Sequence, residues 1–163
     1  MKNILKFIFF VTVLTTTGFG SIASEQSQKL LNPGWSFKGF FGKFDRSSLQ
    51  RGYQVYTEVC AACHSMKYLS YRNLAQQGGP EFSEDQAKII ASQFEVIDGP
   101  NSEGDMFTRP ARLSDNFVGP YANEEAAKSA NGGAYPPDMS VLVKARKGGA
   151  SYIYSILLGY DNP

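Results

Sequence analysis

The sequence predicts a mostly α-helical fold in one domain. Apolar residues recur at spacings of three and four along several segments, as on the buried face of a helix, and the connections between these segments are rich in Gly and Pro. The chain has 163 residues. Removal of an N-terminal targeting segment leaves roughly 140, which suits one domain with a modest core. Without Lys2 and Lys6 the net charge is about −1, so nucleic acid is not an expected partner.

Residues 1–24 have the pattern of a secretory signal peptide. Two lysines precede the apolar run Phe7 to Leu14, and small residues follow it. The run is too short to cross a bilayer as a mature helix, and we expect cleavage after Ala23 or Ser24 rather than retention as an anchor. Residues 25–163 then form the mature domain, which works outside the cytoplasm, in a bacterial periplasm.

Two helices are predicted in the first half of the mature chain. Ser47 or Ser48 caps the first. Its inward face follows the helical spacing and consists of Leu49, Gly52, Tyr53, Tyr56, Val59 and Cys60. The second begins at Ser83, where Gln86 completes a capping box. The residues that it buries are Ala87, Ile90, Ala91 and Phe94.

The second half is predicted to contain shorter helices after a long loop. Residues 97–121 are too rich in Gly, Pro, Asp and Asn for regular structure. A short helix follows over 124–130 and ends at Asn131 and Gly132. Two more are expected over 140–147 and 151–158, each before a glycine. Alternating apolar residues over 151–156 leave a strand as an alternative there.

Both cysteines and the single histidine lie in one short segment, EVCAACHSM, which spans residues 58–66. A disulfide between Cys60 and Cys63 would close only a tight loop. Thiol redox enzymes place such a motif after a strand, whereas an amphipathic helix precedes it here. A structural zinc needs four ligands, one more than the segment offers.

Covalent haem explains all three residues and their order. Two thiols can add to the two vinyl groups of a porphyrin, and His64, which follows Cys63 directly, can ligate the iron. Since His64 is the only histidine, the second axial ligand within this chain would be a methionine, a lysine, water or nothing. Met66 is too close to His64 to reach the opposite face. Met106 and Met139 lie far enough along the chain.

Four runs of sequence carry a resemblance to a known family. They are RGYQVYTEVCAACHSMKYLSYRNL, DGPNSEGDMFTRPARLSDNF, ANGGAYPPDMSVLVKARKGG and YIYSILLGY. In this order they resemble cytochrome c1, the haem subunit of ubiquinol–cytochrome c oxidoreductase, in a bacterial form. The resemblance implies a cytochrome c fold with long Gly/Pro-rich loops around one covalent haem c.

The function implied by the resemblance is electron transfer in the respiratory chain. The partners would be the Rieske iron–sulfur protein as donor, a soluble cytochrome c as acceptor, and cytochrome b, at the periplasmic face of the bacterial inner membrane. The chain alone would catalyse no reaction. A soluble periplasmic monohaem electron carrier and a gas-binding or peroxidase-like haem protein remain as alternatives.

The resemblance also implies roles for individual positions. His64 would ligate the iron, and the proximal side of the haem would be covered by Asn131, Ala134 and Pro137. The carbonyl of Pro137 would accept a hydrogen bond from His64 Nδ1. Arg146 would neutralise a haem propionate. Other groups near the haem would be Tyr152, Ile156 and Leu157.

The family pattern continues past Pro163. In cytochrome c1 the methionine ligand, the last core helix and a membrane anchor all follow the Gly–Tyr segment, so we expect these parts beyond that residue. Gly52 and Tyr56 match residues that cross that last helix. Met139 follows the proximal segment and is not expected to be a ligand. Acidic residues can steer a basic partner, namely Glu95, Asp98, Glu103 and Asp105.

Overall fold

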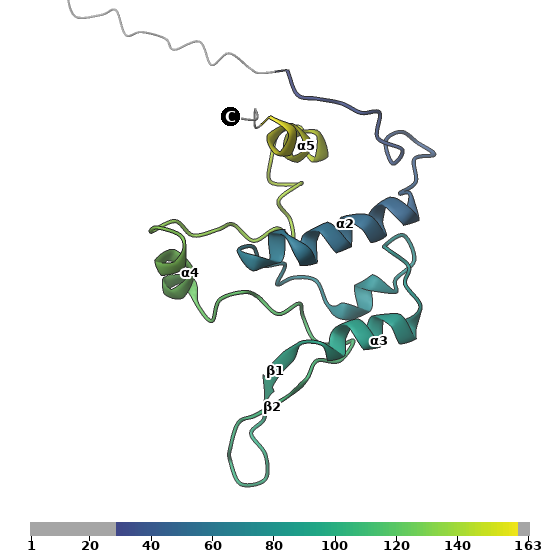
Figure 1. The fold of residues 1–163 in the computed structure, drawn as a ribbon. Helices are drawn as coiled ribbons and strands as arrows, with labels where there is room; N and C mark the ends of the chain where they lie inside the picture. Colours follow the sequence, from purple (N-terminus) through teal and green to yellow (C-terminus); the bar gives the residue numbers. More distant parts are fainter. Residues whose placement is uncertain (1–28, 160–163) are drawn as a thin grey trace, which may run out of the picture.

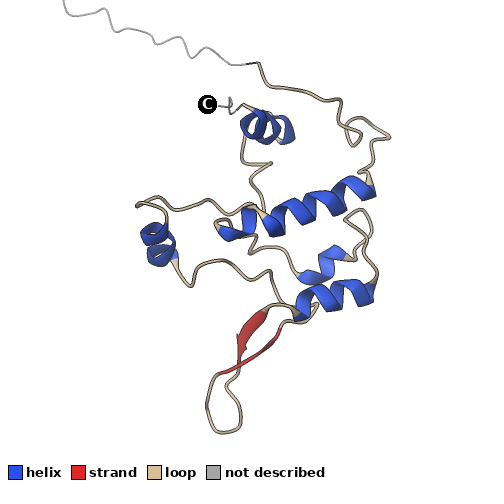
Figure 2. Ribbon diagram, in the orientation of Figure 1, coloured by secondary structure: helices blue, strands red, loops and turns tan. Residues whose placement is uncertain are grey.

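The computed structural model describes residues 29–159, so the predicted signal peptide lies outside the described residues. Long connections join the helices of this part of the chain (Figure 1). The α-helices are α2 (Arg46–Glu58), α3 (Glu84–Ser92), α4 (Glu124–Ala130) and α5 (Ala150–Leu158), with 3-10 helices η1 (Cys60–Ala62) and η2 (Tyr71–Leu74). A small antiparallel sheet pairs β1 (Glu95–Asp98) with β2 (Phe107–Pro110) (Figure 2). The mostly helical class is confirmed.

The helix before the cysteine segment, α2, begins one turn earlier than a serine cap would place it. Asp45 is the cap, and its carboxylate accepts a hydrogen bond from the Ser48 amide at 2.7 Å. The predicted serine cap was wrong, because an aspartate in extended conformation three residues ahead of Ser48 can accept from its amide. On the predicted inward face, Tyr53 and Tyr56 are half-buried but Gly52 is exposed.

The capping box of α3 is confirmed. The Ser83 hydroxyl accepts a hydrogen bond from the Gln86 amide at 3.1 Å, and Gln86 Oε1 accepts one from the Ser83 amide at 2.9 Å. Ala87 and Ala91 are fully buried on the inward face. Two small side chains one turn apart let η2 approach α3 closely, so this helix forms one wall of the core.

The core is an aromatic cluster between α2, α3 and η2. Tyr71 is its largest buried side chain, only 1% exposed, and its ring centroid lies 4.9 Å from that of Phe117 and 5.5 Å from that of Phe94. Phe117 also contacts Tyr53 and Tyr56 of α2, at centroid distances of 6.1 and 6.3 Å. The segment after β2 therefore ties α2 to the rest of the core.

The hairpin β1–β2 corrects the prediction that residues 97–121 lack regular structure. Val96 pairs with Arg109 and Ile97 with Thr108. β-branched residues in these strands favour extended backbone, and the Gly- and Pro-rich residues form only the connection. Arg109 binds Asp98 and also the carboxylate of Asp115, to which Nη1 donates at 2.6 Å. The hairpin is thereby fixed to the chain that follows it.

Two of the three short helices predicted in the second half are present. α4 has the predicted bounds and ends before Asn131, and its cap is Asn123, which was not predicted. α5 ends before Gly159, so the strand alternative there was wrong. Residues 140–147 form turns instead of the predicted helix. Val141 and Val143 are half-exposed there, so no buried face compensates for the low helix propensity of β-branched residues.

Candidate functional site

The two cysteines and His64 share one turn of backbone at the end of α2. The amides of Cys63 and His64 both donate to the Cys60 carbonyl, at 3.1 and 2.8 Å. Neither cysteine is in a disulfide; Cys60 is half-buried and Cys63 is exposed. The turn thus gathers two free thiols and an imidazole within five residues of chain.

A distant carbonyl holds the His64 ring. His64 Nδ1 lies 2.8 Å from the carbonyl oxygen of Pro137, which is 73 residues away in the sequence. A carbonyl oxygen can only accept, so Nδ1 carries a proton, and in the neutral ring Nε2 is then the nitrogen with a free lone pair. In this tautomer the lone pair of Nε2 is available to bind a metal, and the hydrogen bond at Nδ1 fixes the direction in which it points. This is the contact that the family resemblance implied.

Asp138 fastens the segment that carries Pro137 to the chain after His64. Its carboxylate accepts hydrogen bonds from the Ser65 hydroxyl at 2.7 Å, the Lys67 amide at 2.9 Å and the Ser140 amide at 2.9 Å. Next to it, the Met139 amide donates to the Ser65 carbonyl at 2.8 Å. We call this set of contacts the proximal latch. The Pro137 carbonyl is positioned by it.

The charge state of Asp138 follows from these contacts. Burial by itself would raise its pKa, but the hydrogen bonds from Ser140, Lys67 and Ser65 outweigh it and lower the pKa to about 2. Tyr56 also contacts the site, since its hydroxyl donates to the His64 carbonyl at 3.2 Å. Burial raises the pKa of Tyr56 to about 12, so its hydroxyl remains a donor at neutral pH.

Asp138→Asn should weaken the proximal latch in a pH-dependent way. An amide has one acceptor oxygen for three donors, so we expect a loss of about 1–2 kcal/mol in the free energy of unfolding at neutral pH. A lowered pKa stabilises the fold above the unfolded value of 3.8, and this contribution disappears as the pH falls toward 2. Denaturant unfolding of both proteins should therefore differ at pH 6 and converge in acid.

The control for this prediction is Asp85→Asn on α3. The Asp85 side chain is exposed and its nearest cation, Lys88 Nζ, is 3.5 Å away, so its replacement should change stability little. A variant at Asp138 that behaves like the Asp85 variant at every pH would contradict the role of the latch.

Hydrogen bonds through Tyr121 link Asn131 to the cysteine turn. Its side-chain amide donates to the Tyr121 hydroxyl at 3.0 Å and to the Ala127 carbonyl at 2.7 Å. The Tyr121 hydroxyl in turn donates to the Ala62 carbonyl, between the two cysteines, at 3.4 Å. A cavity of about 260 Å³ lies beside Cys63, lined by Tyr121 and Ala127 among others.

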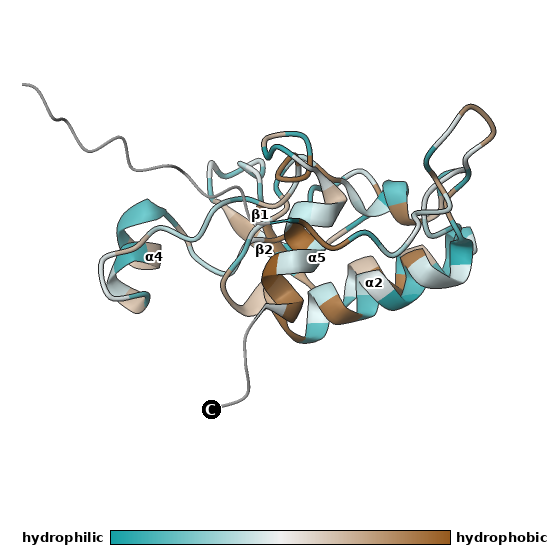
Figure 3. Ribbon diagram, turned by 90° about the horizontal axis from the view of Figure 1, so that it is seen from above, coloured by the Kyte–Doolittle hydropathy of each residue, from teal (hydrophilic) through white to brown (hydrophobic). Residues whose placement is uncertain are grey.

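Most of the other residues implied by the resemblance are exposed in the described chain. Arg146 is exposed, and its guanidinium donates to the Ala145 carbonyl at 3.2 Å. None of the ion pairs between residues 29 and 159 includes it. Ile156 and Leu157 are exposed apolar residues of α5, whose ribbon is strongly apolar along much of its length (Figure 3). Ala134 is exposed and Tyr152 is half-buried.

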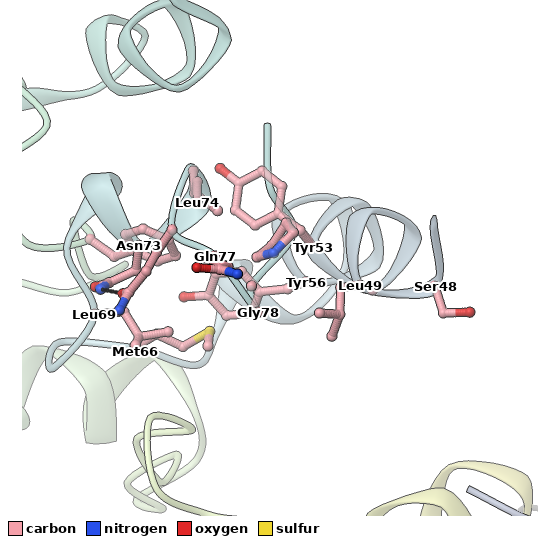
Figure 4. A pocket seen from close by; sticks show the side chains of 15 residues that line it. Ser48, Leu49, Tyr53, Tyr56, Met66, Leu69, Asn73, Leu74, Gln77 and Gly78 are labelled. Atoms are coloured by element: carbon pink, nitrogen blue, oxygen red, sulfur yellow. Dashed lines mark hydrogen bonds between the residues drawn. The ribbon is translucent and has the colours of Figure 1, made fainter. Parts of the chain in front are cut away.

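An apolar groove of about 540 Å³ runs along α2 on the side of η2 (Figure 4). Gly52, Tyr53 and Tyr56 line it from α2, and Met66 and Leu69 from the next segment. A methyl group added at Gly52 would meet no atom within 4 Å. Met66 is thus a groove residue, packed against the core cluster.

Asp138 and Tyr121 were not predicted from the sequence. Asp138 stands in the quoted run AYPPDMS, and the Ser two residues later is typical of a turn in which the aspartate accepts from a backbone amide. That local signal predicts a turn, but it does not reveal the contacts with Ser65 and Lys67, which lie about 70 residues away. In residues 29–159 there is no cluster of three or more His, Cys, Asp and Glu side chains that could hold a metal.

Two free thiols in one turn, followed by a histidine with an available Nε2, define a c-type haem-attachment domain. A model of the Cytochrome C1 family matches residues 35–163. The chain belongs to the cytochrome c1 family.

Curated relatives support the same assignment. "Cytochrome c1 1, heme protein, mitochondrial" of Arabidopsis thaliana is 48% identical over 155 residues, which are 94% of this chain and 50% of that protein. "Cytochrome c1" of Rhodospirillum rubrum is 51% identical over 148 residues, 90% of this chain and 53% of the relative. "Cytochrome b-c1 complex catalytic subunit, mitochondrial" of Candida albicans is 50% identical over 130 residues, 79% and 44% of the two chains. The chain spans about half the length of these relatives.

Proposed function

We propose that this chain binds one haem c covalently and transfers single electrons within a cytochrome b–c1 complex. The donor would be the Rieske iron–sulfur protein and the acceptor a soluble cytochrome c. The observation that carries the proposal is the His64 imidazole, held by Pro137 at 2.8 Å next to two free thiols. The relatives support it, since two of them are named cytochrome c1 and one is named a subunit of the b–c1 complex.

The cysteine turn supplies both thiols for the attachment. Each thiol would add across one vinyl group, so that sulfur bonds to one vinyl carbon and the thiol hydrogen goes to the other. No oxidant is required. His64 would hold the iron through Nε2, and its hydrogen bond to Pro137 would raise the basicity of that nitrogen. The bound iron supplies reversible one-electron chemistry.

The second axial ligand is not assigned to a methionine of the described chain. The Met139 amide is bonded to Ser65, which keeps this residue beside the segment that carries His64. Met66 lines the groove along α2. Met106 is exposed near the start of β2. The geometry therefore supports the expectation that Met139 is not a ligand.

The exposed residues of the second half fit the roles that the family implies. Arg146 is a cation without an acidic partner between residues 29 and 159, so it is available for a haem propionate, and a guanidinium pairs well with a carboxylate. Ile156 and Leu157 expose apolar surface that a porphyrin would cover. We assign Tyr152 to the surroundings of the haem propionates, and Asn131, Ala134 and Pro137 to the proximal side of the haem.

The proposal places the protein at the periplasmic face of a bacterial inner membrane. Export would use the signal peptide predicted over residues 1–24. Cytochrome b and a C-terminal anchor like that of the family would hold it there. Among the helices described between residues 29 and 159, none has both the length and the apolar character needed to cross a bilayer.

Electron transfer can be tested with the haem-loaded chain. Reduced protein mixed rapidly with oxidised soluble cytochrome c should lose its reduced absorption band as the acceptor gains one, with one electron passed per haem. The rate should fall as salt is added, because Glu103 and Asp105 in the β1–β2 connection are free to attract a basic acceptor, whereas Asp98 is paired with Arg109.

A double variant, Glu103→Gln with Asp105→Asn, provides the matched control. It should transfer electrons more slowly at low salt and at the parent rate at high salt. Reduced protein that binds oxygen or carbon monoxide and passes no electron would instead support a gas-binding or peroxidase-like protein. Electron transfer by a full-length gene product found without cytochrome b in the soluble periplasm would support the soluble carrier.

A further inference from the structure

The residues before α2 form an aromatic loop, residues 36–44, that exposes two phenylalanines. Phe40 is 95% exposed and Phe41 is 88% exposed, and their rings meet edge to face with centroids 4.9 Å apart. The loop lies at the edge of the fold, beside the N-terminal end of α2 (Figure 1). Two adjacent aromatic rings that are almost fully exposed are unusual on a protein surface. Such a patch indicates an interaction site that another surface covers.

We propose that the aromatic loop inserts Phe40 and Phe41 into the interface of a phospholipid bilayer that carries anionic lipids. Lys38 and Lys43 contact the lipid phosphates. The proposal concerns a different part of the chain from the cysteine turn, and it does not depend on haem attachment.

The backbone of the loop is closed by its own hydrogen bonds. The Lys43 amide donates to the Ser36 carbonyl at 3.1 Å, and the Ser36 hydroxyl donates to the Lys43 carbonyl at 3.0 Å. Two glycines make this closure possible. Gly39 has a φ of +97°, and a Cβ at Gly42 would lie 2.4 Å from the Phe37 carbonyl oxygen. The two exposed rings are therefore presented by a defined loop.

The base of the loop is fixed to the rest of the domain. Phe37 and Phe44 stack across it with centroids 4.7 Å apart, and Trp35 stacks on Phe37 at 5.4 Å. Trp35 Nε1 donates to the Ser151 hydroxyl of α5 at 2.8 Å, and its ring meets Tyr154 edge to face. Insertion of the loop tip would therefore orient the whole domain on the membrane.

The charges around the tip match a lipid surface better than a protein surface. Lys38 and Lys43 flank the two phenylalanines, and residues 36–44 contain no acidic residue. Lysine is depleted from the buried centres of protein interfaces, where it would lose its hydration. At a membrane interface, aromatic rings enter the apolar boundary while lysines beside them remain at the phosphates. This arrangement favours the bilayer as the occupant.

A nitroxide label at position 41 tests the insertion directly. The haem-loaded mature chain with Phe41→Cys is labelled and reconstituted in vesicles of phosphatidylglycerol and phosphatidylethanolamine. Oxygen concentrates in the bilayer and a nickel chelate stays in water, so the label should show a several-fold higher ratio of oxygen to nickel accessibility than one at Ile97→Cys. Ile97, in β1, is 75% exposed and lies outside the loop.

Equal nickel accessibility at positions 41 and 97 would overturn the proposal. Protection of the label from both reagents would also overturn it, because that pattern indicates burial against a protein. The parent chain is the labelling blank, and its mass must show that residues 1–24 have been removed, since the apolar run there would bind vesicles by itself.

The lysines and the phenylalanines make separable contributions. For the mature haem-loaded chain, Phe40→Ser with Phe41→Ser should lower vesicle binding several-fold on both anionic and phosphatidylcholine vesicles. Lys38→Gln with Lys43→Gln should lower it several-fold on phosphatidylglycerol vesicles and leave it unchanged on phosphatidylcholine. Unchanged vesicle binding by the variant in which both phenylalanines are replaced by serine would contradict insertion of the loop tip.

Discussion

Exported protein in which Cys60 and Cys63 are both replaced by Ala should carry no haem after denaturing electrophoresis. The thioether bonds need both sulfurs, and a haem held only by His64 is lost when the chain unfolds. The parent, produced with the same maturation machinery, should keep a haem-stained band. The expected effect is complete loss of covalent haem.

Ser65→Ala is the matched control for the cysteine variant. It changes the residue next to His64 and removes one hydrogen bond to Asp138, but it leaves both thiols in place. Its band should stain like that of the parent. A stained band from the double cysteine variant would contradict the proposed attachment, and an unstained Ser65→Ala band would show that attachment depends on the latch as well as on the thiols.

Tyr71→Ala should cause the largest loss of stability of any single change in the aromatic core. Tyr71 is 1% exposed and packs on Phe94 and Phe117. Removing its ring leaves a cavity between α3 and the segment after β2, at an expected cost of about 3–5 kcal/mol in the free energy of unfolding. Denaturant unfolding of the haem-loaded protein measures it.

Two further variants show how much of the loss in stability comes from the ring of Tyr71. One removes only its hydroxyl, and the other removes an exposed tyrosine elsewhere. Tyr71→Phe removes only the acceptor for the Val118 amide, at 3.4 Å, and should cost about 0.5–1.5 kcal/mol. Tyr68→Ala removes a side chain that is 66% exposed, and should stay within about 0.5 kcal/mol of the parent. Equal losses at positions 68 and 71 would contradict the core assignment.

Local chemistry made some elements predictable. The capping box at Ser83 and Gln86 and the end of α4 before Asn131 and Gly132 both depend on residues a few positions apart, so the sequence contains the whole signal. The serine cap predicted for α2 failed locally, because Asp45 is a competing cap three residues before Ser48, whereas the other failures depend on tertiary partners. Residues 140–147 have helical spacing, but Val141 and Val143 remain about half exposed in the fold. The hairpin β1–β2 depends on pairing and on Arg109, which binds two carboxylates from different segments.

The candidate site divides in the same way. The cysteines and His64 are predictable because the chemistry of haem attachment fixes their order within five residues. The contact between His64 and Pro137 was available only through the family resemblance, since spacing says nothing about residues 73 positions apart. Tyr121 acts through a long-range hydrogen bond to the cysteine turn and Asp138 through bonds to the residues directly after it, and no periodicity marks such residues.

The site has a local half, the turn from Cys60 to His64, and a distant half, Pro137. Because of this distance in sequence, we expect the two halves to form at different stages of folding. The turn from Cys60 to His64 closes over four residues and can form while most of the chain is still disordered. The bond from His64 to Pro137 closes a loop of 73 residues, which costs about 4 kcal/mol in chain entropy before any contact offsets it. For a chain exported as proposed, we expect the thiols to be offered as a local peptide before Pro137 reaches the histidine. Maturation enzymes would then meet an open segment, and the histidine would take its final orientation after the cysteine turn has formed.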